Sequence, residues 1–272
     1  MFATCFLYGG LGNQLFQIFT TIAYSLKHNI QLKLIYTENL GKRPVYWGSL
    51  LSGLSSYLSI DIDIDALQKI KQPSGFLIDA PKNNSVILDG YFQSPYFFDS
   101  YYSDILTICG IKKIQEDIYY DFNAKYNNYT CISMHFRRGD YKEIQHIHPI
   151  MPLEYYENAL AYATAVLSKD KYLVLYFCED EDAEEIKMND IAKLQKTFTN
   201  CEFRRFVGSS DWEEMLYMSC CDANIIANSS FSWWGAYMNR RGDTICYPGK
   251  WFGKDPFPKT MFPDDWIKIS WM

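Results

Sequence analysis

The chain has 272 residues, of which 48% are hydrophobic, and its formal net charge is −6. This length allows one large domain or two modest α/β domains, and the hydrophobic content is typical of a folded protein. The acidic balance argues against non-specific nucleic-acid binding, which needs a basic surface.

The eight cysteines show no C-x-x-C spacing, and several lie in apolar runs. They are therefore expected to be buried thiols in a reducing compartment. The N-terminal residues form no basic leader, and no apolar run approaches the ~20 residues that span a bilayer. These features predict a cytoplasmic protein.

A glycine-rich turn joins the first predicted strand to the first predicted helix. It contains Gly10, Gly12 and Asn13. Glycines let the backbone approach a ligand, and a helix N-terminus favours an anion. The pattern differs from the dinucleotide-binding G-x-G-x-x-G, because Leu15 occupies the position of the last glycine. A tight turn alone would explain the glycines but not the amide pair Asn13–Gln14.

The next hundred residues are less regular. Strands are predicted at 31–36 and 85–89, and an aromatic-rich helix at 95–108. The alternating aspartates at 61–65 are interpreted as a cap on a following helix rather than as a metal site. They lack the glycine and the final acidic ligand of a calcium loop, and they do not end a hydrophobic strand.

From residue 130 the pattern becomes regular, after a polar, tyrosine-rich stretch at 115–129 that is interpreted as a linker. Predicted helices alternate with predicted strands at 130–136, 172–178, 203–207, 223–227 and 244–247. This alternation predicts a doubly wound parallel sheet, which binds ligands at the carboxyl ends of its strands.

Charged side chains crowd the end of the strand at 130–136. His135, Arg137, Arg138 and Asp140 lie within six residues. One interpretation is a surface turn with an Arg–Asp ion pair. The other is a phosphate site, because the planar guanidinium donates two parallel hydrogen bonds to phosphate.

A second polar strand end is Asn228-Ser229-Ser230. These residue types cap helices well, so capping alone is one interpretation. The other is that the free N–H groups of the helix point at a bound diphosphate beside the arginines.

Together these segments resemble a known family. The sequence GGLGNQLFQ at 9–17, HFRRGDY at 135–141 and NSSFSWWG at 228–235 are similar to the three motifs of the α-1,2-fucosyltransferases, glycosyltransferase family eleven. The resemblance implies a GT-B type α/β fold with two Rossmann-like doubly wound domains facing a central cleft. The expected divisions are an acceptor-side domain at 1–125, a GDP-sugar-binding domain at 126–250, and a tail at 251–272 that packs back across the cleft.

The resemblance also implies the reaction. An inverting, metal-independent enzyme would transfer L-fucose from GDP-β-L-fucose to the 2-hydroxyl of a terminal galactose in an oligosaccharide or surface polysaccharide precursor. GDP-fucose is the donor substrate, and no cofactor is expected. The missing N-terminal anchor of animal members implies a bacterial-type enzyme, soluble or peripheral at the inner face of the inner membrane, with an acceptor that is lipid-linked in some systems.

By the same resemblance, Arg137 would stabilise the leaving β-phosphate. The remaining predicted donor-binding residues are Gly10, Gly12, Asn13, His135, Arg138, Asn228, Ser229, Ser230 and Phe231. Adjacent strand residues face opposite sides, so Arg138 has the alternative of pointing away and pairing with a carboxylate.

The predicted general base, which must activate the acceptor hydroxyl, is Asp140, with Glu143 and then His135 as alternatives. His146-x-His148 is interpreted as part of an acceptor-side loop, because no third metal ligand is spaced to join it. Glu179-Asp180 either lines the cleft or opens a helix. The aromatic segment 247–252 is a predicted acceptor wall.

Three other functions are compatible with parts of the sequence. A non-catalytic nucleotide-sugar or sugar-binding protein would need no base, and a fucosyltransferase of another linkage is compatible with the sequence. A glycoside hydrolase with paired carboxylates would leave the Arg-Arg and Ser-Ser strand ends unexplained.

Overall fold

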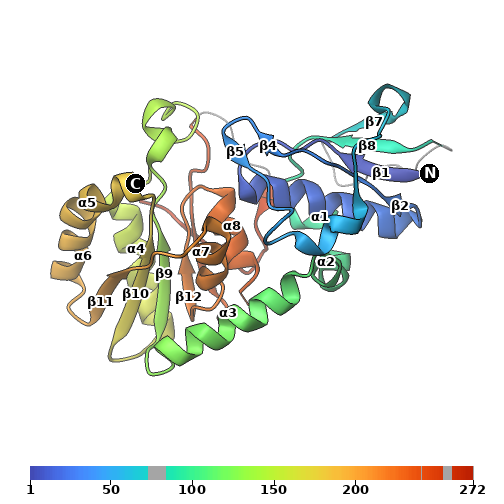
Figure 1. The fold of residues 1–272 in the computed structure, drawn as a ribbon. Helices are drawn as coiled ribbons and strands as arrows, with labels where there is room; N and C mark the ends of the chain where they lie inside the picture. The colour runs from blue at the N-terminus through green and yellow to red at the C-terminus, as the bar shows by residue number, and fades with distance from the viewer. Residues whose placement is uncertain (73–83, 240, 254–258, 272) are drawn as a thin grey trace. The chain divides into compact units, whose positions relative to one another are not determined.

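The computed structural model describes residues 1–72, 84–239, 241–253 and 259–271. The chain divides into two compact units (Figure 1). The first contains Met1–Glu116 and Pro258–Phe262, and the second contains Asp117–Phe257 and Pro263–Met272. The chain therefore returns to the first unit briefly before its last strand.

The first unit is built on a four-stranded parallel sheet in the order β2-β1-β8-β7. Its strands are β1 (Phe2–Cys5), β2 (Gln31–Leu32), β7 (Gln68–Lys71) and β8 (Val86–Asp89). Helix α1 (Leu11–His28) connects β1 to β2 and is buried along most of its length. Two of its buried hydroxyls are satisfied locally, since Thr21 and Ser25 donate to carbonyls one turn back, whereas Thr20 Oγ1 has no partner among the described residues.

Shorter elements complete this unit. They are β3 (Leu34–Ile35) paired with β6 (Leu58–Ser59), the hairpin of β4 (Asn39–Leu40) and β5 (Arg43–Pro44), helix α2 (Tyr102–Cys109), and the 3₁₀ turns η1 (Ser52–Tyr57), η2 (Ile64–Ala66), η3 (Pro95–Phe97), η4 (Asp99–Tyr101) and η8 (Lys259–Met261). The predicted strand at 31–36 is thus two short strands.

The predictions for two other segments of this unit need correction. The aspartates at 61–65 do not cap an α-helix, because the chain forms the 3₁₀ turn η2 and then the strand β7. The predicted helix at 95–108 begins as two 3₁₀ turns and becomes α-helical only at Tyr102.

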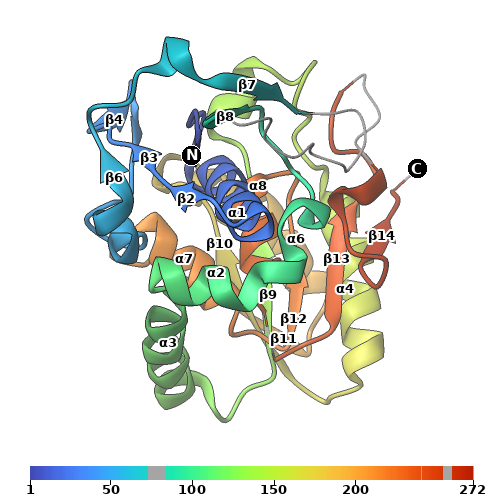
Figure 2. The ribbon, with the colours of Figure 1, turned by 90° about the vertical axis from the view of Figure 1, so that its right-hand side faces the viewer.

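The second unit contains a six-stranded parallel sheet in the order β11-β10-β9-β12-β13-β14 (Figures 1 and 2). Its strands are β9 (Cys131–His135), β10 (Tyr172–Phe177), β11 (Cys201–Arg205), β12 (Ala223–Ile225), β13 (Thr244–Pro248) and β14 (Ile267–Ile269). In chain order within the unit this is 3-2-1-4-5-6, the strand order of dinucleotide-binding Rossmann sheets. The order reverses between β9 and β12, so a ligand crevice is expected beyond their carboxyl ends.

Helices cover both faces of this sheet. They are α3 (Ile111–Tyr126), α4 (Leu153–Leu167), α5 (Ala183–Ile186), α6 (Ala192–Thr197), α7 (Asp211–Met218) and α8 (Ser230–Tyr237), with a π turn, η7 (Lys187–Ile191), between α5 and α6. One core joins Ile132, Met134 and Phe136 to α4, α5 and α6. The other joins Cys131 to α3 and α7. The alternation along β9 confirms the predicted doubly wound α/β class for this unit.

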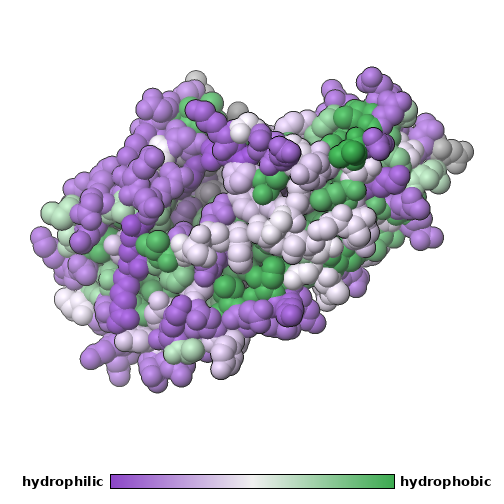
Figure 3. Space-filling view, in the orientation of Figure 1, coloured by the Kyte–Doolittle hydropathy of each residue, from purple (hydrophilic) through white to green (hydrophobic). Residues whose placement is uncertain are grey.

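Residues 115–129 do not form the predicted linker, because α3 extends through Tyr126. Phe122 is fully buried against Tyr217, whereas the outward side chains of α3 include charged residues and the exposed Tyr119 and Tyr120. Hydrophilic residues gather over this helix in Figure 3. The polar outer face of an amphipathic helix was mistaken for a linker.

Candidate active site

His135 ends β9 and is buried, with 7% of its surface exposed. Among the described residues, its Nδ1 has no hydrogen-bond partner. Burial, and then the charge of Arg137, lowers the pKa of the imidazole to about 3. The ring is therefore neutral near pH 7. It can contribute a hydrogen bond to a ligand, but not a positive charge.

Arg137 carries a fixed positive charge beyond the end of β9. Its guanidinium pairs with the carboxylates of Asp140 and Glu179, and lies 4.9 Å from the centre of the Tyr141 ring. Burial lowers its pKa, but the two carboxylates outweigh burial and raise the pKa above its ordinary value. The group is charged, oriented and only partly covered, as a phosphate-binding side chain must be.

Arg138 points to the other face of the sheet. It pairs with Glu185 and with the buried Asp190, both in the segment between β10 and β11. Burial raises the pKa of Asp190, against the opposing effect of Arg138. This is the alternative orientation that strand alternation allowed, and in it Arg138 holds two elements of the second unit together.

A network beneath the motif fixes the turn that carries Asp140. Gly139 has a φ of +37°, and its N–H donates to Asp182 across 2.8 Å. A Cβ there would lie 1.8 Å from Oε2 of Glu179. Lys142 pairs with the same Asp182 at 2.6 Å. Glycine is favoured at this position because the positive φ strains any other residue and because a Cβ would displace the Glu179 carboxylate that pairs with Arg137.

Asp140 and Glu143, the predicted bases, lie in the 3₁₀ turn η5 (Gly139–Glu143). The side chain of Asp140 is 47% exposed and pairs with Arg137. Glu143 is exposed at the far end of the turn. Asp140 is thus the candidate held beside the fixed positive charge.

The second predicted strand end belongs to β12. The buried Asn228 donates from its amide to the carbonyl oxygens of Pro149 and Trp251, at 2.9 and 3.0 Å. It thereby ties two loops to this edge of the sheet. Its Oδ1 has no partner among the described residues, which leaves one acceptor at the site.

Ser229 is the N-cap of α8. Its Oγ accepts a hydrogen bond from the N–H of Phe231 at 3.3 Å, as the capping interpretation predicts. Ser230 opens the helix and is partly exposed. Capping and anion binding are compatible here, because a serine hydroxyl can also donate outward.

The ends of β9 and β12 are brought together by the sheet. Met134 pairs with Ile225 in parallel register, so Arg137 and Asn228 lie at equivalent depths. The hydroxyl of Tyr141 donates to the Asn228 carbonyl at 3.1 Å. Residues from the two predicted segments therefore share one edge, at the reversal of strand order.

The glycine-rich turn lies in the first unit. Gly9 has a φ of +75° and Gly10 precedes α1, where a Cβ would meet no atom within 4 Å. Gly12 lies in the first turn of α1. The Oδ1 of Asn13 accepts from Gln93 at 2.8 Å.

The other amides of this motif are structural. Gln14 donates to the carbonyls of Gly9 and Pro44, and Gln17 bonds both backbone groups of Tyr8. Both side chains are fully buried. They fix the turn from beneath, which accounts for amides where a tight turn alone would not need them.

Glu179 is a site residue whose position sequence reasoning left open. Phe177 pairs with His135 in parallel register, so two residues further on Glu179 lies beside Arg137. Asp180 instead pairs with Arg205 at the end of β11. Knowing the strand order 3-2-1 would have been enough to place Glu179 at the arginine.

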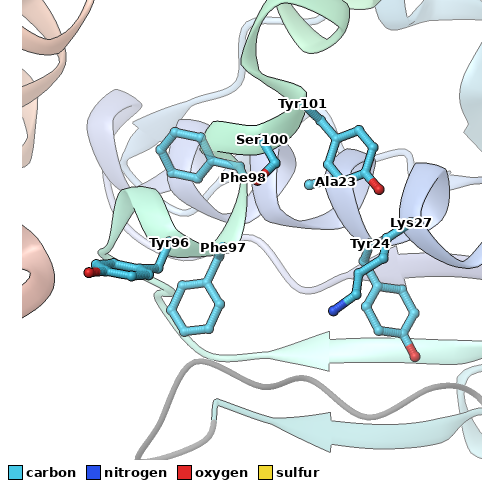
Figure 4. A pocket seen from close by; sticks show the side chains of 8 residues that line it. All are labelled: Ala23, Tyr24, Lys27, Tyr96, Phe97, Phe98, Ser100 and Tyr101. Carbon is cyan, nitrogen blue, oxygen red and sulfur yellow. The ribbon is translucent and has the colours of Figure 1, made fainter.

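Cavities lined by described residues occur in both units. One in the first unit has a volume of about 200 Å³ and no predicted site residue; Figure 4 shows its lining, Ala23, Tyr24, Lys27, Tyr96, Phe97, Phe98, Ser100 and Tyr101. The other, of about 550 Å³ in the second unit, lies beside the Arg138 ion pairs and the start of α4.

His148, which the sequence placed in a predicted acceptor-side loop, lies among aromatic rings. His148 stacks on Tyr141 with ring centres 4.7 Å apart, and Phe252 lies beyond it at 5.5 Å.

All eight cysteines are free and buried. Across the described ranges, no group of three His, Cys, Asp or Glu side chains is arranged to hold a metal ion. No helix of the described part of the chain is long and apolar enough to cross a bilayer.

Comparison with known sequences shows the family. Residues 56–271 match the model of Glycosyl transferase family 11. The O-antigen biosynthesis glycosyltransferase WbnK of Escherichia coli is 32% identical over 199 residues, which is 68% of this chain and 61% of that protein. An alpha-1,2-colitosyltransferase of Escherichia coli is 27% identical over 294 aligned positions, covering 97% of each chain.

Solved structures are similar at low sequence identity. The fucosyltransferase NodZ from Bradyrhizobium has a TM-score of 0.46 at 12% identity, covering 89% of this chain and 94% of that one. A glycosyl transferase family 9 protein from Veillonella parvula has a TM-score of 0.49 at 11% identity, covering 100% and 87%. Both scores are low, so the fold assignment rests on the strand order within the units.

Proposed function

Because the chain belongs to glycosyl transferase family 11, we propose that it transfers L-fucose from GDP-β-L-fucose to the 2-hydroxyl of a terminal galactose. The acceptor would be an oligosaccharide or surface polysaccharide precursor. The α-1,2 linkage is supported by the relative that aligns over 97% of this chain, an alpha-1,2-colitosyltransferase.

The observation that carries this proposal is that Arg137 and the N-terminus of α8 follow two neighbouring parallel strands, β9 and β12. Both lie at the carboxyl edge of a 3-2-1-4-5-6 sheet, beyond the two strands where the order reverses. A diphosphate bound there would meet a guanidinium fork on one side and helix N–H groups and serine hydroxyls on the other.

In the proposed reaction the bond between fucose C1 and the β-phosphate oxygen breaks, and its electron pair remains on GDP. Arg137 stabilises the negative charge that grows on that phosphate, since its own charge is already fixed in place. The hydroxyls of Ser229 and Ser230 donate to the remaining oxygens. The Phe231 N–H, which donates to Ser229 Oγ at 3.3 Å in the structure, would exchange that partner for a phosphate oxygen.

The acceptor oxygen attacks C1 from the opposite face, which inverts the β-donor to an α-product. Its proton passes to Asp140. In the structure Asp140 is paired with Arg137. Binding of the donor diphosphate at the guanidinium would compete with Asp140 for Arg137.

A second donor is favoured by one observation. The colitosyltransferase relative aligns from end to end, and colitose is L-fucose without its 3-hydroxyl. The phosphate contacts proposed above would serve either GDP-sugar equally, because they do not involve the sugar ring.

The test is a matrix of GDP-L-fucose, GDP-colitose and GDP-mannose against β-galactosides and β-glucosides, with products identified by mass. The proposal predicts deoxyhexose transfer to galactosides alone. Transfer from GDP-mannose, or GDP-fucose cleavage without any glycoside product, would contradict it. EDTA should leave the rate unchanged, because Arg137 supplies the positive charge.

A further inference from the structure

A cluster of polar and aromatic side chains lies at the carboxyl edge of the first unit's sheet and is unused by the chemistry above. Strands β1 and β8 are parallel neighbours, and the N–H of Phe6 donates to the Leu88 carbonyl at the end of both. Asp89 ends β8, and Tyr8 lies just beyond β1. Ligands bind at this edge of open parallel sheets.

Two tyrosines in this cluster are exposed. Tyr8 is 38% exposed and Tyr91 is 47% exposed, with ring centres 6.1 Å apart. Aromatic faces of this kind pack against the apolar C–H face of a pyranose. The two neighbouring exposed rings at this edge can therefore pack against the face of a sugar ring.

Hydrogen-bonding groups lie beside these rings. The hydroxyl of Tyr8 donates to Asp89 at 3.0 Å, and Lys69 pairs with the same carboxylate at 3.1 Å. The Lys69 ammonium also lies 5.4 Å from the centre of the Phe6 ring. A carboxylate, an ammonium and a phenol in contact offer acceptors and donors to neighbouring sugar hydroxyls.

The loop that presents Tyr91 is held in a strained conformation. Phe92 has a φ of +51°, which is rare for an aromatic residue, and its side chain is fully buried. Gln72 accepts hydrogen bonds from the N–H groups of Tyr91 and Phe92, at 3.0 and 2.8 Å. The next residue, Gln93, bonds Asn13 of the glycine-rich turn. Such strain persists only where surrounding contacts enforce it, and here it turns Tyr91 outward.

We propose that Tyr8, Asp89 and Tyr91 form the subsite that binds the terminal sugar of the acceptor, a neutral hexopyranose. Asp89 would repel the diphosphate of the donor, whereas it accepts hydrogen bonds from hydroxyls. The assignment of this sugar as galactose rests on the proposed function, but the subsite itself requires only a neutral pyranose.

Kinetics and direct binding together test the subsite. Tyr91→Ala should raise the acceptor KM at least tenfold, and Asp89→Asn should do likewise, while the Kd for GDP stays within twofold. Tyr91→Phe should retain most of the affinity, because it keeps the ring. Tyr120→Ala, at a tyrosine that is 80% exposed on α3, is the control and should change neither constant.

Saturation-transfer NMR with lactose, without donor, separates this inference from the proposed function. A wild-type signal that Tyr91→Ala abolishes supports the subsite even if no fucose is transferred. An unchanged acceptor KM or NMR signal in folded Tyr91→Ala and Asp89→Asn would overturn it, even if the wild type proves to be a fucosyltransferase.

Discussion

Replacing each of the two adjacent arginines should have a different effect. Replacing Arg138 should lower the stability of the protein, whereas replacing Arg137 should lower its affinity for GDP. In Arg138→Met, the buried carboxylate of Asp190 loses its partner; the two side chains are only 11% and 8% exposed. Removing one member of a buried pair costs about 3–5 kcal/mol, whereas the pair with the 46% exposed Glu185 adds at most about 1 kcal/mol. We expect a loss of roughly 3 kcal/mol, which lowers Tm by about 6–12 °C for a protein of this size.

Arg137→Met should be nearly as stable as the wild type, because its partners Asp140 and Glu179 are 47% and 42% exposed. Its affinity for GDP should fall about 10- to 100-fold, the effect of about 1.5–3 kcal/mol from charge-assisted hydrogen bonds. Arg138→Met should bind GDP normally at a temperature where it is folded.

Differential scanning calorimetry and isothermal titration with GDP measure both effects. The double variant Arg138→Met/Asp190→Leu is the matched control, since removing the unpaired carboxylate should recover much of the lost stability. If Arg138→Met were stable but lost GDP binding, the assignment of the two arginines to opposite faces would be refuted.

Three further predictions concern Asp140, Gly139 and His135. Asp140→Asn should lower turnover about 10²- to 10⁴-fold with GDP affinity retained, and Glu143→Gln should not; near wild-type turnover in Asp140→Asn would exclude it as the base. Gly139→Ala should destabilise the protein by about 1–3 kcal/mol in thermal unfolding, because of its positive φ and the carboxylate 1.8 Å from the new Cβ. Gly10→Ala, where a Cβ meets no atom within 4 Å, should not. Burial lowers the pKa of His135 to about 3, so folding favours the neutral ring, and its contribution to stability is full above about pH 6.5. The free energy of unfolding should therefore fall by about 1.4 kcal/mol per pH unit between roughly pH 6 and 4. Urea unfolding at a series of pH values measures this fall, and the same pH dependence in His135→Asn would contradict the assignment.

Sequence periodicity predicted the second unit well for a physical reason. Its strands are buried on both faces, so they appear as continuous apolar runs, and each is followed by a helix with one apolar stripe. The limits of β9 and β10 agree with prediction to within one residue at each end. The short edge strand β14 was missed, because its three residues pair on one side only.

The first unit was harder to predict because its elements are short. Two-residue strands and 3₁₀ turns give no measurable periodicity over so few residues. The strand β7 alternates polar with partly buried residues, and beside an aspartate run this pattern was mistaken for a helix start.

The candidate site was also predictable only in part. Local sequence indicated which strand ends carry ligand-binding groups, and strand alternation indicated that Arg137 and Arg138 face opposite sides. Which carboxylates they meet was not predictable, because Glu179 and Asp190 come from segments more than forty residues away. Only the strand order and register decide those contacts.

The central claim is tested most directly by the linkage of the product. After incubation with GDP-L-fucose and lactose, two-dimensional NMR of the purified trisaccharide should show an α-fucosyl anomeric proton correlated with C2 of galactose. A β-anomer, a correlation to any other galactose carbon, or the absence of a fucosylated product with every β-galactoside would contradict the account.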